Sequence, residues 1–291
     1  MADANGSFIL LMLTMYGISM PFMGWLVSRI PAQKIEERKM TAGQWIIAFL
    51  MCYGLMYAGN LIGTALTFGI GMVKGTGVDN PLVSTVMQLN PWVTFVIAVL
   101  IAPTAEELLF RKLLTERIVK YGELTAVLAS GLFFGLFHGN LNQFSYAFLL
   151  GLFLGFIYVK TGKLRYTIGL HMAINFIGSS LGTWMLRVTG YMDTMETLTE
   201  FLNTKNLEVL ADLGNGIVGM FIFGSYASLI LMMAGAGLIL MWLNRKKFVC
   251  CAPEEKVASL GKKKAAVMIG NPGILLYGAF WIGIMIWQLL Q

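Results

Sequence analysis

Residues 91–111 read PWVTFVIAVLIAPTAEELLFR, and this stretch decides how the chain is interpreted. Its first part is an apolar run of the kind that crosses a membrane as a helix of about 20 residues. Two adjacent carboxylates, Glu106 and Glu107, follow, and Arg111 lies one helical turn after the second. Ionisable side chains inside a span are costly and therefore usually functional. The stretch indicates a membrane helix that carries a polar site.

The composition of the whole chain agrees with this interpretation. Of 291 residues, 57% are hydrophobic and 12% are charged, and the mean hydropathy is +0.72. Soluble domains carry roughly 25% charged residues. We therefore expect an all-α polytopic membrane bundle, because a helix satisfies its own backbone hydrogen bonds in lipid. No polar segment is long enough for a second core, so the chain is expected to form a single domain over residues 1–291. About eight spans are predicted, at residues 8–28, 45–72, 91–111, 124–140, 143–160, 166–186, 215–243 and 273–290.

The basic residues indicate how the spans are oriented. Of the 21 lysines and arginines, all but Lys74, Arg187 and Lys205 fall in one set of alternate loops. The positive-inside rule places that set in the cytosol and both termini outside. It also explains the net charge of +6 without a nucleic-acid partner. We expect a multi-pass protein of a bacterial cell membrane, with the lipid bilayer as its surroundings.

Two further patterns concern packing and cysteines. Gly131, Gly135 and Gly139 recur every four residues, as do Gly151 and Gly155. Small residues at this spacing let membrane helices approach closely, so tight packing of spans four and five is predicted. The three cysteines form neither a disulfide framework nor the C-x-x-C spacing of a zinc site.

The ionisable groups within the spans cluster in the middle of the chain. The two histidines of the sequence, His138 and His171, both fall in apolar spans, and Asn175 follows His171 by one turn. Glu107 and Arg111 share a helix face and can form an ion pair. Glu106 is rotated by about 100° from Glu107 and has no arginine on its own face. We therefore expect Glu107 to be held and Glu106 to be free to exchange a proton.

The positions along the helices predict that these groups meet. Glu106 and His138 lie at similar distances on either side of the turn near residues 121–122, so a helical hairpin places them at similar depth. His171 lies six residues beyond Arg165, about 9 Å inward at 1.5 Å per residue. Pro103 lacks an N–H and is expected to loosen the helix before the carboxylates. The sequence predicts one cavity in the cytosolic half, where a carboxylate and imidazoles could activate water for hydrolysis.

Three motifs in this order resemble those of a known family. E-E-x-x-x-R is formed by Glu106, Glu107 and Arg111, F-x-x-x-H by Phe134 and His138, and H-x-x-x-N by His171 and Asn175. They resemble the motifs of the CAAX protease and bacteriocin-processing family, also called CPBP or Abi, whose members are intramembrane glutamic endopeptidases. The resemblance covers about residues 91–186. Pro103 fits the family's P-x-x-E-E arrangement, whereas Lys112 stands where many relatives carry a small residue.

The resemblance implies a role for each matching residue. Glu106 would be the base that activates water, and His138 would hold that water. His171 and Asn175 would supply the oxyanion hole. Supporting roles would fall to Glu107, Arg111 and Phe134. The implied activity is endopeptidase cleavage of a peptide or protein at the membrane, lipidated or otherwise apolar, with no cofactor and no metal.

Three alternatives remain open on the residues alone. A zinc-dependent protease could use the two histidines and Glu106, although H-E-x-x-H is absent from the sequence. A transporter or proton relay also uses intramembrane Glu and His. A non-catalytic immunity or scaffold protein would act by binding alone.

Overall fold

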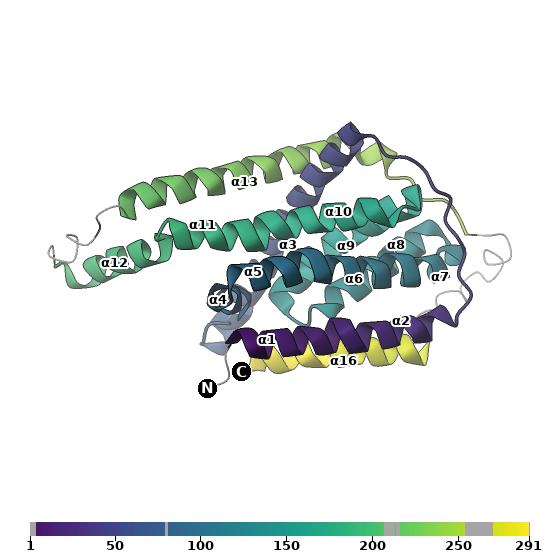
Figure 1. Cartoon of the computed structure of the whole chain (residues 1–291), viewed down its shortest axis with the longest axis horizontal. Helices are drawn as coiled ribbons and strands as arrows, with labels where there is room; N and C mark the ends of the chain where they lie inside the picture. The colour runs from purple at the N-terminus through teal and green to yellow at the C-terminus, as the bar shows by residue number, and fades with distance from the viewer. Residues whose placement is uncertain (1–3, 79–80, 207–212, 214–215, 254–269, 291) are drawn as a thin grey trace.

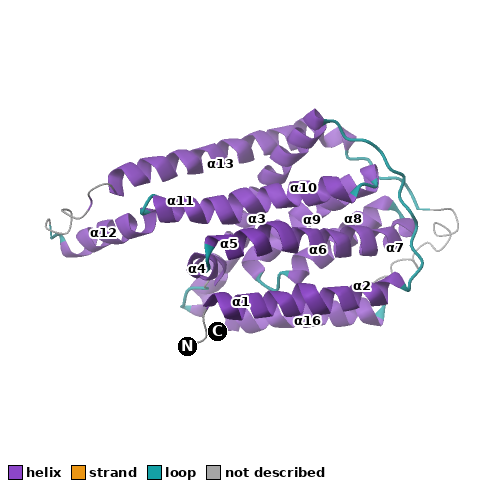
Figure 2. Cartoon of the chain, in the orientation of Figure 1, coloured by secondary structure: helices purple, strands orange, loops and turns teal. Residues whose placement is uncertain are grey.

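The computed structural model describes residues 4–78, 81–206, 213, 216–253 and 270–290. Every regular element in these ranges is a helix (Figure 2), which confirms the all-α class. The elements are α1 (Ala4–Met12), η1 (Leu13–Ser19), α2 (Met20–Ser28), α3 (Ala42–Lys74), α4 (Pro81–Gln88), α5 (Pro91–Thr94), η2 (Phe95–Ile101), α6 (Ala102–Glu107), η3 (Leu108–Thr115), α7 (Glu116–Ile118), η4 (Val119–Tyr121), α8 (Glu123–Phe137), α9 (Leu141–Thr161), α10 (Leu164–Asn175), η5 (Phe176–Leu181), α11 (Gly182–Val188), α12 (Tyr191–Thr204), α13 (Gly216–Asn244), η7 (Arg245–Lys247) and α16 (Pro272–Leu290).

Six helical segments among the described residues are long and apolar enough to cross a membrane. The chain is thus a polytopic helical membrane protein, as its composition predicted. The six are Ala4–Ser28, Ala42–Lys74, Pro91–Tyr121, Leu141–Thr161, Gly216–Lys247 and Pro272–Leu290.

Two segments that we expected as spans are not among the six. Helix α8 is a shorter apolar helix of 15 residues, less than the roughly 20 that a full crossing needs. The other is the continuous helix α10–η5–α11, which carries His171 and Asn175 and is therefore more polar. Both segments still run along the bundle beside the longer helices, and the two ends of the chain lie at the same end of it (Figure 1).

The basic loops gather at the opposite end of the bundle from the chain termini. Backbone hydrogen bonds join Gln33 to Glu116, Arg38 to Thr161 and Glu123 to Cys251. These bonds link four loops into one layer, as expected of loops on a single side of a membrane. Lys256 and Lys262 to Lys264, which we assigned to the same side, lie outside the described residues. Which side faces the cytosol stays a prediction.

Close packing surrounds α9, which contacts both α8 and α3. A Cβ placed on Gly131 would lie 2.6 Å from Leu152 Cδ2, and one on Gly151 would lie 3.0 Å from Gly131 Cα. On the other side of α9, a Cβ on Gly59 would lie 2.4 Å from Tyr146 Cα. The predicted close approach of spans four and five is therefore confirmed, and α3 packs against α9 in the same way.

Candidate active site

The two glutamates lie on a helix that departs from α geometry on both sides of them. Helix α6 holds Glu106 and Glu107 and is flanked by the π-helical segments η2 and η3. Pro103 stands at the start of α6, where the helix runs on from η2, so its missing N–H removes a hydrogen bond from a continuous helix. Short π-helical segments occur frequently at functional sites. The backbone geometry thus points to a functional site at α6.

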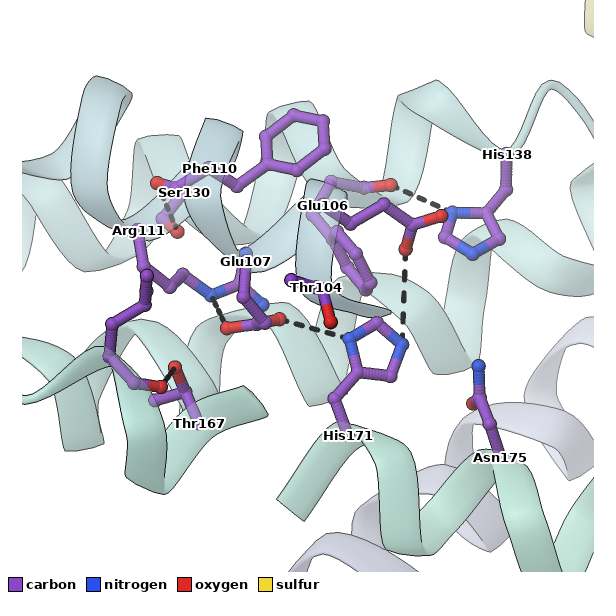
Figure 3. A network of polar contacts seen from close by, with 12 residues as sticks. Thr104, Glu106, Glu107, Phe110, Arg111, Ser130, His138, Thr167, His171 and Asn175 are labelled. Atoms are coloured by element: carbon purple, nitrogen blue, oxygen red, sulfur yellow. Dashed lines mark hydrogen bonds and ion pairs between the residues drawn. The ribbon is translucent and has the colours of Figure 1, made fainter. Parts of the chain in front are cut away.

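Glu107 is held on the interior side of α6. Its carboxylate is fully buried, and Arg111 Nε lies 3.0 Å from Oε2. The Oε1 atom is 3.0 Å from His171 Nδ1. Glu107 therefore joins the arginine of its own helix to the histidine of α10 (Figure 3). The ion pair that the spacing predicted is present, and it orients His171 as well.

Glu106 points away from that pair. Its side chain is 8% exposed, and Oε2 lies 3.8 Å from His171 Nε2, too far for a direct hydrogen bond. In Figure 3 its carboxylate faces the rings of both His138 and His171. The two adjacent glutamates thus contact opposite nitrogens of one imidazole, so they divide as the helical spacing predicted.

His138 lies at a turn rather than within a helix. Helix α8 ends at Phe137, and Gly139 follows with a φ of +60°, a left-handed conformation that glycine adopts without strain. His138 Nδ1 is 2.9 Å from the Phe134 carbonyl oxygen. A carbonyl only accepts, so Nδ1 carries the proton and Nε2 is left for another partner. We expected His138 inside a span, and the structure places it one residue beyond the helix.

Phe134 is the packing centre of the site. Its ring is 5.0 Å from the ring of His138 and 5.5 Å from that of His171, centroid to centroid. The guanidinium carbon of Arg111 lies 4.7 Å from the ring centroid. Phe134 itself is 1% exposed. The three motifs found in the sequence therefore meet around one aromatic ring.

Asn175 follows His171 by one turn of α10 and lies beside it in Figure 3. Its Nδ2 donates to the carbonyl oxygen of Ala98, 2.8 Å away in η2. A side-chain amide has two N–H donors, so this bond leaves the second one. The bond also ties α10 to the helix that carries the glutamates.

Tyr16 is a polar contact of the site that the motifs did not reveal. Its hydroxyl donates to Glu106 Oε1 over 2.6 Å, from η1 in the N-terminal helix. The signal in the sequence is a tyrosine within an apolar span, where its hydroxyl needs a partner. That signal does not say which partner, because the two residues are 90 positions apart.

An apolar groove of about 600 Å³ lies next to Tyr16. It runs between the N-terminal helix and the segment formed by α5 and η2. Its lining residues are Ile9, Met12, Leu13, Tyr16, Gly17, Trp92, Val93, Val96, Ile97 and Ile101. The groove therefore reaches the tyrosine that contacts Glu106.

The histidines and carboxylates of the site are side-chain types that can also bind a metal ion. Within the residues that the structure describes, no group of three or more His, Cys, Asp or Glu side chains is placed to hold a metal ion. His171 uses Nδ1 for Glu107, so Nε2 is the nitrogen that it presents toward Glu106.

Comparison with known proteins gives one match. Residues 88–177 match the family model described as type II CAAX prenyl endopeptidase Rce1-like. Comparisons with curated proteins and with solved structures each gave no match. The matched segment begins just before α5 and ends in η5, so it contains all three motifs. The resemblance seen in the sequence is thereby confirmed: residues 88–177 of this membrane protein are similar to the CAAX protease family.

Proposed function

We propose that this protein is an intramembrane endopeptidase in which Glu106 activates the attacking water. The family match supports a membrane CAAX protease in general terms. The observation that carries the finer proposal is the placement of Glu106. Its carboxylate faces two imidazole rings, while its neighbour Glu107 is paired with Arg111.

The arrangement supports a general-base hydrolysis. Glu106 takes a proton from water while His138 Nε2 accepts the water's second hydrogen bond. The hydroxide bonds to the carbonyl carbon of the scissile peptide, and a tetrahedral oxyanion forms. Breakage of the C–N bond follows, and Glu106 returns the proton to the leaving nitrogen. A carboxylate in this role typically contributes 10²- to 10⁴-fold to the rate.

The oxyanion requires N–H donors at a fixed position. Asn175 keeps one N–H after its bond to Ala98. His171 Nε2 donates when the ring carries a proton on both nitrogens, with Glu107 accepting from Nδ1. We therefore assign the oxyanion hole to these two side chains and the support of His171 to Glu107 and Arg111.

The substrate is proposed to be apolar around its cleavage site. The groove beside Tyr16 is lined almost entirely by apolar side chains and lies next to the carboxylate's partner. A membrane protease family implies substrates that are themselves at or in the bilayer. A lipidated peptide or an apolar protein segment meets both conditions.

The test is cleavage by the purified protein in proteoliposomes, with products identified by mass spectrometry. The panel contains prenylated, acylated and unmodified apolar peptides. Glu106→Gln is expected to lower kcat by about 10²-fold or more, and His138→Ala and His171→Ala are expected to lower it as well. Glu196→Gln, on the exposed face of α12, serves as the matched control and keeps the wild-type rate. Equal rates for the wild type and Glu106→Gln on a cleaved peptide would refute the mechanism.

The same assay separates the alternatives. A chelator that abolishes cleavage, with activity restored by zinc, would favour the metalloprotease. Solute or proton flux without cleavage would favour a transporter. Binding of a peptide that stays intact in every arm would favour a non-catalytic immunity protein.

A further inference from the structure

The N-terminal helix contributes a polar group to the site from outside the matched core. Tyr16 lies in η1, far from residues 88–177, so the family match assigns it nothing. Its phenol donates to Glu106 Oε1 over 2.6 Å. A hydrogen bond to a charged acceptor at this length is among the strong ones in proteins. The bond therefore connects the proposed base to a helix that the motifs do not include.

The surroundings of Tyr16 show that this bond is not a by-product of dense packing. Of the apolar 18-residue stretch within Ala4–Ser28, 6% is buried inside the molecule. Among its described residues, Met20 is the one that is buried, with 8% of its surface exposed. Tyr16 lies within the π-helical segment η1 of this helix. A loosely covered helix thus directs one hydroxyl onto one carboxylate.

The bond determines which oxygen of Glu106 is available. Oε1 is occupied by Tyr16, and Oε2 faces His171 Nε2 at 3.8 Å. A catalytic group works best when its own partners lock its orientation. We infer that Tyr16 is a positioning residue of this enzyme, which fixes the Glu106 carboxylate so that Oε2 receives the proton of water. This inference rests on the proposed function.

Several charged and titratable groups surround the Glu106 carboxylate. They come from its own helix and from four other parts of the fold, and they are Tyr16, Glu107, Arg111, His138, Tyr146 and His171. Of these, Tyr16 makes a direct hydrogen bond to the carboxylate. Its loss therefore removes that hydrogen bond without removing any charge.

The experiment compares Tyr16→Phe with Tyr158→Phe in the full-length protein. Tyr158 makes the same kind of bond, from its hydroxyl to Glu116 Oε1 over 2.8 Å, at the end of α9 away from the site. Tyr16→Phe is expected to lower kcat on the order of tenfold or more, as for a misplaced catalytic group, with KM within about twofold. A change in kcat at constant KM is expected because the substrate still binds while the carboxylate is no longer held in place. Tyr158→Phe keeps the wild-type kcat and KM.

Two results would overturn the inference. One is a Tyr16→Phe variant that keeps the wild-type kcat per molecule of folded protein, the folded fraction being measured by size-exclusion chromatography in detergent. The other is an equal change in Tyr158→Phe. Failure of the proposed function is visible separately, because the wild-type protein would then cleave no peptide at all.

Discussion

Helix α9 and the N-terminal helix α1–η1–α2 are both long and apolar enough to cross a membrane, yet they are built into the molecule very differently. In the apolar 18-residue stretch of each helix, 61% is buried inside the molecule for α9 and 6% for the N-terminal helix. The adjacent glutamates follow the same division. Glu107 faces the packed interior, and Glu106 contacts Tyr16 of the loosely covered helix. Burial therefore indicates what holds the fold, but it does not indicate which helices take part in the site.

The largest effect that we expect comes from the buried ion pair. Arg111→Leu leaves the Glu107 carboxylate, which is 0% exposed, without its cation. Stranding one partner of a buried pair costs about 3–5 kcal/mol of stability. Thermal unfolding in detergent micelles should show a clear drop in the midpoint. The double variant Glu107→Leu with Arg111→Leu should recover part of it, because no buried charge is then left alone.

Lys112 supplies the control for that prediction. It is the next residue and also forms an i,i+4 pair, with Glu116 Oε1 at 2.7 Å, but its side chain is 43% exposed. Glu116 is 8% exposed, but it keeps the hydrogen bond from the Tyr158 hydroxyl after the lysine is removed, so Lys112→Leu should lower the midpoint less than Arg111→Leu. If Arg111→Leu proved no worse than Lys112→Leu, the interior would not depend on the pair.

The next effect tests the packing around α9 directly. A Cβ on Gly59 would lie 2.4 Å from the Cα atom of Tyr146, so even Gly59→Ala must push α3 and α9 apart. Overpacking of this kind costs typically about 1–3 kcal/mol. The same change at Gly17 of the N-terminal helix meets nothing within 4 Å. Gly17→Ala should leave the unfolding midpoint unchanged or raise it slightly, and equal losses at both positions would contradict the contrast between the two helices.

The features that depend on residue spacing within one helix could be predicted from the sequence. The i,i+4 spacing of Glu107 and Arg111 predicted their pair, and the glycines four residues apart predicted the contact of α8 with α9. The hydropathy pattern predicted a helical membrane protein. The order of the motifs predicted a family that the match over residues 88–177 confirms.

Contacts between helices that are distant in the sequence could not be predicted from residue spacing. Periodicity places a residue on a helix face but does not say what that face meets. His171 was assigned to the oxyanion alone, whereas its Nδ1 is bonded to Glu107. Tyr16 was missed because nothing in the first span names a partner 90 residues away. Helix α8 was expected as a span because an apolar run does not give the length of the helix that contains it. The helix α10–η5–α11 is long enough, but its polar residues keep it outside the six.

The smallest expected effect concerns the groove beside the N-terminal helix. Val96 lines it and is 43% exposed, so Val96→Trp fills part of the groove without entering the packed interior. For an apolar substrate that lies there, KM should rise by roughly tenfold, which corresponds to about 1.4 kcal/mol of lost binding. The value of kcat should stay unchanged, because Glu106 and its partners are untouched. Leu229→Trp on α13, also at an exposed position, is the control for added bulk and should alter neither constant. A Val96→Trp variant with the wild-type KM would show that the substrate reaches Glu106 by another path, and the N-terminal helix would then contribute only its tyrosine.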